Sequence, residues 1–114
     1  MTTDDAARQL QEHVRRFNHG VREGDFGEML THLDQEAEMY FAGVPAGPFI
    51  GLAAIADAYR ENPPDDEIVL LNASADGEGA AGDYAWRSDS TTPAGRLAIR
   101  VADGRITRLE VSFR

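Results

Sequence analysis

The fold is decided by residues 96–113, which read RLAIRVADGRITRLEVSF. The dipeptide Asp103-Gly104 near the middle is a strong signal for a two-residue hairpin turn. On both sides of this turn, apolar residues alternate with polar or small ones, which is the period of a strand with one covered face. The apolar set is Leu97, Ile99 and Val101 before the turn and Leu109, Val111 and Phe113 after it. The stretch therefore predicts two antiparallel strands whose apolar face must be covered by other elements.

The sequence upstream of this hairpin predicts two more strands. Residues 67–75 are rich in Val, Leu and Ala, and residues 80–91 carry Tyr84 and Trp86 on one face. Turns that contain glycine or proline separate these runs from each other and from the hairpin. Because short turns join antiparallel neighbours, we expect four consecutive antiparallel strands in the second half of the chain.

The first half of the chain predicts three helices and one strand. Apolar residues recur there at helical spacing, and residues that cap or end helices bound each run. The expected elements are a helix capped by Thr3 and ended by Gly24, a second helix that opens with a capping box of Asp25 and Glu28, a strand over 36–42, a loop over 43–51, and a third helix that starts at Leu52 and is stopped by Asn62-Pro63-Pro64. These helices are the only available cover for the sheet, so we expect one α+β domain spanning residues 1–114.

Composition and charge narrow the classes of function. The formal net charge of −9 repels phosphate backbones and anionic surfaces, so neither nucleic acid nor a membrane is an expected partner. There is no cysteine, which excludes disulfides and thiolate chemistry. The segment Met1–Asp5 is polar and acidic, unlike a secretory signal, and no run of about 18 apolar residues is present to span a membrane. We therefore expect a cytoplasmic protein.

Three short segments occur in an order that resembles the nuclear transport factor 2-like (NTF2-like) superfamily. They are VREGDF at 21–26, GLAAI at 51–55 and DGRI at 103–106. Together with the order of helices and strands, they make the chain from about Ala7 to Phe113 similar to the SnoaL-like polyketide cyclases and ketosteroid isomerases. The resemblance implies a cone-shaped fold, or cystatin-like roll, in which three helices pack into a curved antiparallel sheet around a small hydrophobic molecule. It also implies a homodimer formed through the outer sheet face.

The resemblance does not fix the reaction. Ketosteroid isomerases use an acidic base together with a phenol and a protonated acid that stabilise an enolate. By the resemblance, the phenol position falls at Phe17, the base position at Phe41 or Ala42, and the second acid near Leu97, where no side chain can move a proton. We therefore do not expect ketosteroid isomerase activity. Three readings stay open: an enzyme of the SnoaL-like cyclase or isomerase kind acting on a hydrophobic substrate, polycyclic ones included; a non-catalytic binder of a small hydrophobic molecule; and a dimerisation module.

The candidate acid or base groups are His13, Tyr40 and Tyr84. His13 lies at the edge of the apolar stripe of the first helix, where it either faces the pocket or sits at its rim. Tyr40 lies between Met39 and Phe41, and we expect this flanking pair to face inward. A shift of register by one residue would turn Tyr40 inward instead.

The remaining candidates are walls for an apolar ligand. Tyr84 and Trp86 share a strand face that either grips a ring-shaped molecule or packs in the core. The predicted ligand-binding residues are Phe17, Met39, Phe41, Tyr59, Trp86, Leu97, Ile99, Leu109 and Val111. No group of His, Asp and Glu has the spacing of metal ligands, so we expect no metal and no cofactor.

The opposite face of the predicted sheet is charged. It collects Asp83, Arg87, Asp89, Arg96, Arg100, Arg108 and Glu110. Mixed charges on neighbouring strands can pair with each other. This face is expected to be either solvated or the polar interface of the homodimer.

Overall fold

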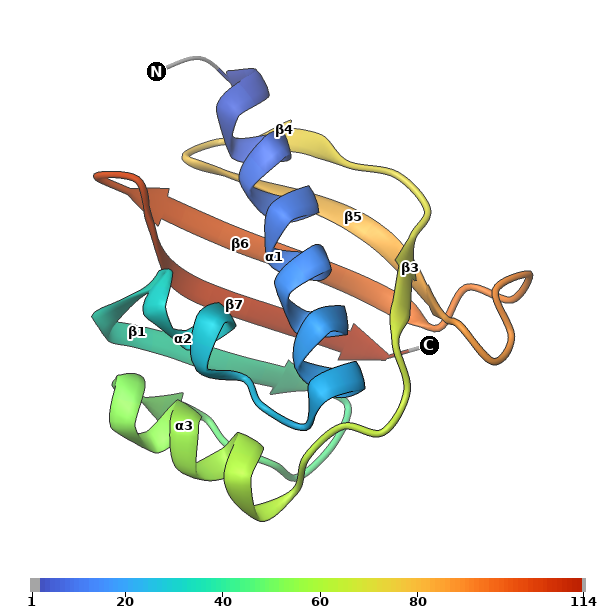
Figure 1. Cartoon of the computed structure of the whole chain (residues 1–114). Coiled ribbons are helices and arrows are strands. Elements are labelled where there is room, and N and C mark those ends of the chain that lie inside the picture. The colour runs from blue at the N-terminus through green and yellow to red at the C-terminus, as the bar shows by residue number, and fades with distance from the viewer. Residues whose placement is uncertain (1–2, 114) are drawn as a thin grey trace.

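Three helices and seven strands make up the computed structural model, which describes residues 3–113 and the side chains from Asp5 onward. In chain order they are α1 (Thr3–Glu23), α2 (Gly27–Thr31), β1 (Leu33–Ala42), β2 (Phe49–Ile50), α3 (Leu52–Glu61), β3 (Ile68–Leu70), β4 (Ser74–Asp76), β5 (Gly79–Trp86), β6 (Gly95–Ala102) and β7 (Arg105–Phe113). Figure 1 shows the long helix α1 lying across the sheet. The predicted α+β class is confirmed.

The strands form one curved sheet in the order β2-β1-β7-β6-β5-β3, with β4 also paired to β5. The meander β5-β6-β7 is antiparallel, as its short turns require. Leu97 is opposite Val111 and Ile99 is opposite Leu109, so these apolar residues share one face. The pair β1 and β7 is parallel, which makes the sheet mixed. No short turn joins these two strands, so turn length does not dictate their relative direction.

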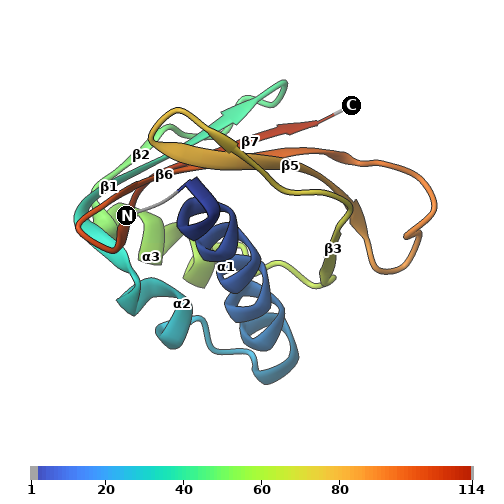
Figure 2. The same ribbon diagram turned by 90° about the horizontal axis from the view of Figure 1, so that it is seen from above.

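All three helices lie on one side of the sheet, as Figure 2 shows from above. The most deeply buried large side chains come from both layers, among them Leu10 of α1, Ile55 of α3 and Leu109 of β7. Each such side chain contributes roughly 1.5–3 kcal/mol when it leaves water. The helices therefore cover the inner face of the sheet, and the outer face is left to the charged residues.

The predicted strand over 67–75 is broken into β3 and β4. At the break, the side-chain amide of Asn72 pairs with Asp83 of β5: its oxygen accepts from the Asp83 backbone N–H at 3.1 Å, and its nitrogen donates to the carboxylate at 3.1 Å. The chain approaches β5 so closely here that a Cβ on Gly82 would lie 1.8 Å from the Asn72 carbonyl oxygen. A glycine at 82 is therefore required for the break.

The predicted strand over 80–91 ends early, at Trp86. The backbone N–H of Asp89 turns back to the Trp86 carbonyl at 3.0 Å, and the Ser88 hydroxyl donates to Asp66 at 2.6 Å. Arg87 and Asp89 consequently lie in a loop beyond β5, and the prediction that placed them on the outer sheet face was wrong.

The helix starts and the first strand also differ from prediction. The second helix begins at Gly27 instead of Asp25, and the Asp25 carboxylate accepts the Gly27 N–H at 2.8 Å from just outside the helix. The first strand begins at Leu33, three residues before the predicted start. The predicted cap at Thr3 falls on a side chain outside those described, and Met1 and Thr2 lie outside the described residues.

Candidate functional site

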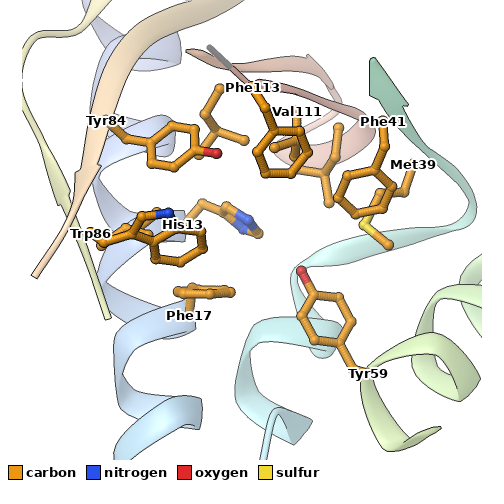
Figure 3. Close-up of a pocket in the computed structure, with 12 residues that line it drawn as sticks. His13, Phe17, Met39, Phe41, Tyr59, Tyr84, Trp86, Val111 and Phe113 are labelled. Carbon is orange, nitrogen blue, oxygen red and sulfur yellow. The ribbon is translucent and has the colours of Figure 1, made fainter. Parts of the chain in front are cut away.

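A cavity of about 100 Å³ lies between the inner sheet face and the helices. Its lining comes from the helices α1 and α3 and from the strands β1, β3, β5, β6 and β7. The lining residues are His13, Phe17, Met39, Phe41, Tyr59, Ile68, Tyr84, Trp86, Leu97, Leu109, Val111 and Phe113. Figure 3 shows the labelled rings and aliphatic side chains turned toward a common centre. Segments far apart in the sequence thus supply one apolar chamber.

Eight of the nine predicted wall residues line this cavity. Ile99 is the exception: it is 3% exposed and belongs to the closed part of the hydrophobic core, on a strand that α1 contacts. Sequence reasoning missed Ile68 and Phe113 as lining residues. Phe113 carried a usable signal, since it continues the alternation of Leu109 and Val111 along the last strand.

His13 lies inside the cavity lining, and not at the rim, with only 4% of its surface exposed. Burial, with a smaller contribution from the positive charge of Arg16, lowers the pKa of its imidazole to about 4. The ring is therefore neutral at pH 7. Within the described part of the chain, its Nδ1 atom is buried and has no hydrogen-bond partner. A neutral imidazole has one donor and one acceptor nitrogen, so this side chain can bind a polar atom of a ligand.

Tyr84 brings a second buried polar atom to the same chamber. Its side chain is 2% exposed, and its hydroxyl finds no hydrogen-bond partner among the described residues. Its ring packs edge-on against Trp86 at a centroid distance of 5.7 Å, which directs the hydroxyl toward the middle of the cavity in Figure 3. Burial raises the pKa of the Tyr84 phenol, so the group stays protonated and can donate.

Tyr59 closes the cavity from the side of α3. Burial raises the pKa of this phenol to about 12. The ring rests on Phe26 at 4.9 Å and meets Phe17 edge-on at 6.5 Å. In Figure 3 its hydroxyl points away from α3 and into the cavity. Tyr59 therefore stands at the boundary between the α3 side and the sheet side of the chamber.

Tyr40, one of the three predicted acid or base groups, lies on the outer face of the sheet. Its hydroxyl donates to the Glu38 carboxylate, and the Arg108 guanidinium lies 4.2 Å from the centre of its ring. The hydrogen bond to Glu38 is the main reason that the pKa of Tyr40 is raised. Because Met39 and Phe41 face the cavity and side chains alternate along a strand, Tyr40 must face away. Its assignment as a catalytic residue is corrected.

The chamber offers neutral, mostly apolar chemistry. Its lining contains no carboxylate and no lysine or arginine in the described structure. Among residues 3–113, no three His, Asp or Glu side chains come together as a possible metal site. Nor is any helix in this range long and apolar enough to cross a membrane. The polar groups available to a ligand are the imidazole of His13, the phenols of Tyr59 and Tyr84, and the indole N–H of Trp86.

A family model for the SnoaL-like domain matches residues 14–109. The chain therefore belongs to the SnoaL-like domain family, as the sequence resemblance predicts. No protein with a curated description matches the chain.

Solved structures share the fold at low sequence identity. A candidate isomerase from Bacillus subtilis is 19% identical with a TM-score of 0.73, covering 100% of this chain and 90% of that one. An NTF2-like protein of unknown function from Cytophaga hutchinsonii is 16% identical with a TM-score of 0.68, covering 100% and 91%. A candidate polyketide cyclase from Sinorhizobium meliloti is 19% identical with a TM-score of 0.64, covering 92% and 97%. These likenesses show the NTF2-like, cystatin-like fold, and they do not show which activity the chain has.

Proposed function

We propose that the chain binds a small, neutral, largely apolar molecule that carries one oxygen function, with the oxygen at His13 and Tyr84. The observation that carries this proposal is a pair of buried polar atoms in the lining of a mostly apolar cavity, His13 Nδ1 and Tyr84 Oη, neither of which has a partner among the described residues. A buried polar group without a partner costs roughly 1–3 kcal/mol. A ligand hydroxyl or carbonyl that pairs with these atoms removes that cost.

The electrostatics of the cavity support a neutral ligand. Neither wall residue with an unpartnered atom is charged at pH 7, and no cationic side chain belongs to the lining of the described structure. A carboxylate moved into such surroundings would lose its hydration without gaining an ion pair, which is costly. A phenol or a ketone loses much less and gains hydrogen bonds.

The test compares phenol with benzoate, which have the same ring and differ in charge at pH 7. Thermal unfolding of the purified protein is followed with each compound at millimolar concentration. Phenol is expected to raise the midpoint and benzoate to leave it unchanged, because only a ligand of the folded state stabilises it. Equal stabilisation by benzoate, or none by phenol, would contradict the proposal. Tyr40→Phe, on the outer face, is the matched control and should respond like the wild type.

A second candidate function, proton transfer of the isomerase or cyclase kind, is favoured by the basicity of His13. Its pKa of about 4 is close to that of about 4.6 for the carboxylate base of a ketosteroid isomerase, which abstracts a proton next to a carbonyl. Tyr84 is a protonated donor in the same chamber, suited to hydrogen-bond a carbonyl oxygen as it becomes an enolate. In this function His13 is the base and Tyr84 is the oxyanion donor.

This second function is tested by deuterium exchange at the α-carbons of cyclohexanone in D₂O, followed by NMR. The wild type is expected to exceed the buffer rate, and His13→Gln is expected to return to it, while Tyr40→Phe keeps the wild-type rate. Exchange at the buffer rate in the wild type, or an unchanged rate in His13→Gln, would leave binding alone as the function.

A further inference from the structure

A second apolar chamber adjoins the cavity and shares three of its wall residues, Met39, Phe41 and Tyr59. Its volume is about 260 Å³. The other walls come from the segment after β1 and from the end of α3 and the residues that follow. They are Ala46, Phe49, Ala58, Asn62 and Pro64. The three shared side chains thus form a partition between two hollows on the same side of the sheet, and Figure 3 shows them together at one side of the cavity.

The volumes indicate that the first chamber is too small to be a complete site. It measures about 100 Å³, whereas an apolar cavity of about 150 Å³ is known to admit benzene. A ring placed against His13 and Tyr84 must therefore displace part of the wall. The two chambers add to about 360 Å³, inside the range of about 300–1,000 Å³ usual for ligand sites, and neither chamber reaches that range alone.

The partition is built from side chains that can move. Met39 is unbranched and flexible, and neither Met39 nor Phe41 carries a strong hydrogen-bonding group that a rotation would leave unpaired. Phe41 is only half-buried, and its neighbours are the rings of Phe49 at 6.2 Å and Phe113 at 6.3 Å. Phe113 is itself 39% exposed. A rotation of Phe41 therefore disturbs a loosely covered edge of the core and not its centre.

We infer that the two chambers form one site for a single elongated, neutral ligand of two rings, or of one ring with a chain of similar length. This inference rests on the proposed function, because His13 and Tyr84 hold the oxygen of the ligand in the first chamber. The second ring passes the partition and lies against Ala58 and Phe49. Its far end reaches Asn62, which is exposed, so a polar substituent is tolerated there.

The experiment measures dissociation constants of phenol and 4-phenylphenol by calorimetry. The wild type is expected to bind 4-phenylphenol at least about tenfold more tightly, because the second ring is buried as well. Ala58→Leu fills the second chamber from α3 with a good helix former. In this variant the gain from the second ring is expected to disappear, while phenol still binds. Ala58→Ser, which adds little volume, is the matched control and should keep the gain.

A second variant keeps the test decisive if Ala58→Leu does not fold. Ala46→Leu fills the same chamber from an exposed position outside the helices and strands, and it is expected to abolish the same gain. If phenol binds the wild type but 4-phenylphenol binds no more tightly, or if both leucine variants keep the gain, the two-chamber inference is wrong and the proposed function stands. If neither compound binds the wild type, the proposed function fails and this inference fails with it.

Discussion

The polar groups on the two faces of the sheet differ in charge and exposure. On the outer face, the half-exposed Arg108 side chain donates to Glu110 through one terminal nitrogen at 2.8 Å, although its Nε is buried without a partner among the described residues. On the inner face, His13 Nδ1 and the Tyr84 hydroxyl are fully buried and have no partner within the described structure. Exposed ion pairs contribute little to stability, whereas a buried polar atom without a partner is costly. Outer-face substitutions should therefore be nearly silent, and inner-face polar groups should respond to a ligand.

The largest expected difference between the faces falls on two adjacent residues of β7. Leu109 is 1% exposed and faces the helices, while Glu110 faces outward. Leu109→Ala is expected to lower the free energy of unfolding by about 2–5 kcal/mol, because it removes buried methyl groups and enlarges a cavity. Glu110→Ala is expected to change it by less than about 1 kcal/mol. Urea unfolding of the two variants measures both values, and equal losses would contradict the assignment of faces.

The next largest effect is a loss of stability in acid caused by His13. Its folded pKa of about 4 lies below the ordinary value of 6.5, so the folded state binds this proton less readily than the unfolded state. The stability that neutral His13 contributes is fully present above pH 6.5 and is lost as the pH falls toward 4. The total loss of unfolding free energy is about 3 kcal/mol. Carboxylates titrate in the same range, so the measured quantity is the difference in unfolding free energy between wild type and His13→Gln. If this difference is the same at pH 7 and at pH 4, the His13 side chain is exposed to water and the account of its burial is wrong.

A smaller effect is expected where one amide attaches β3 to α1. Asn18 is 8% exposed; its amide nitrogen donates to the Ile68 carbonyl at 2.9 Å, and its oxygen accepts the Ile68 N–H at 2.8 Å. Asn18→Ala leaves both backbone groups without this partner and is expected to cost about 2 kcal/mol. Arg22 lies on the same helix as Asn18 and forms an ion pair with Glu67 at the surface. Arg22→Ala breaks this pair and should cost less than about 1 kcal/mol. Thermal unfolding that ranks these two variants in the reverse order would contradict this account of β3.

The smallest effect has opposite signs on the two faces. In the absence of ligand, Tyr84→Phe removes an unpartnered buried hydroxyl and is expected to stabilise the fold by up to about 1 kcal/mol. Tyr40→Phe removes a hydroxyl bonded to Glu38 and is expected to destabilise by a similar amount or less. Calorimetric unfolding of both variants decides the signs. A destabilised Tyr84→Phe would mean that its hydroxyl has a partner in solution.

The sequence predicts the face of each strand better than the extent of the strands or the cover above them. Alternation correctly turned Met39, Trp86 and Leu97 toward the helices, because a period of two follows from strand geometry alone. It could not show that Ile99 is closed off in the core while Leu109 reaches the cavity, since that depends on where the helices cross the sheet. For the same reason, the sequence did not predict that His13 is deeply buried.

The strand ends and one strand direction depended on long-range contacts. The break at Asn72 rests on its hydrogen bonds to Asp83, a pairing across 11 residues that local propensity does not contain. The parallel pairing of β1 with β7 joins segments that no short turn connects. Neither feature leaves a periodic signal in the sequence, whereas the Asp103-Gly104 turn does and was found at the predicted place.

The most direct measurement compares phenol with toluene, which replaces the hydroxyl by a methyl group, in wild type and Tyr84→Phe. If the chamber recognises an oxygen through Tyr84, the ratio of the toluene to the phenol dissociation constant should fall by about tenfold in the variant, which corresponds to one hydrogen bond of about 1.4 kcal/mol. The same ratio in both proteins would contradict the account, because the ligand would then be held by its apolar surface alone.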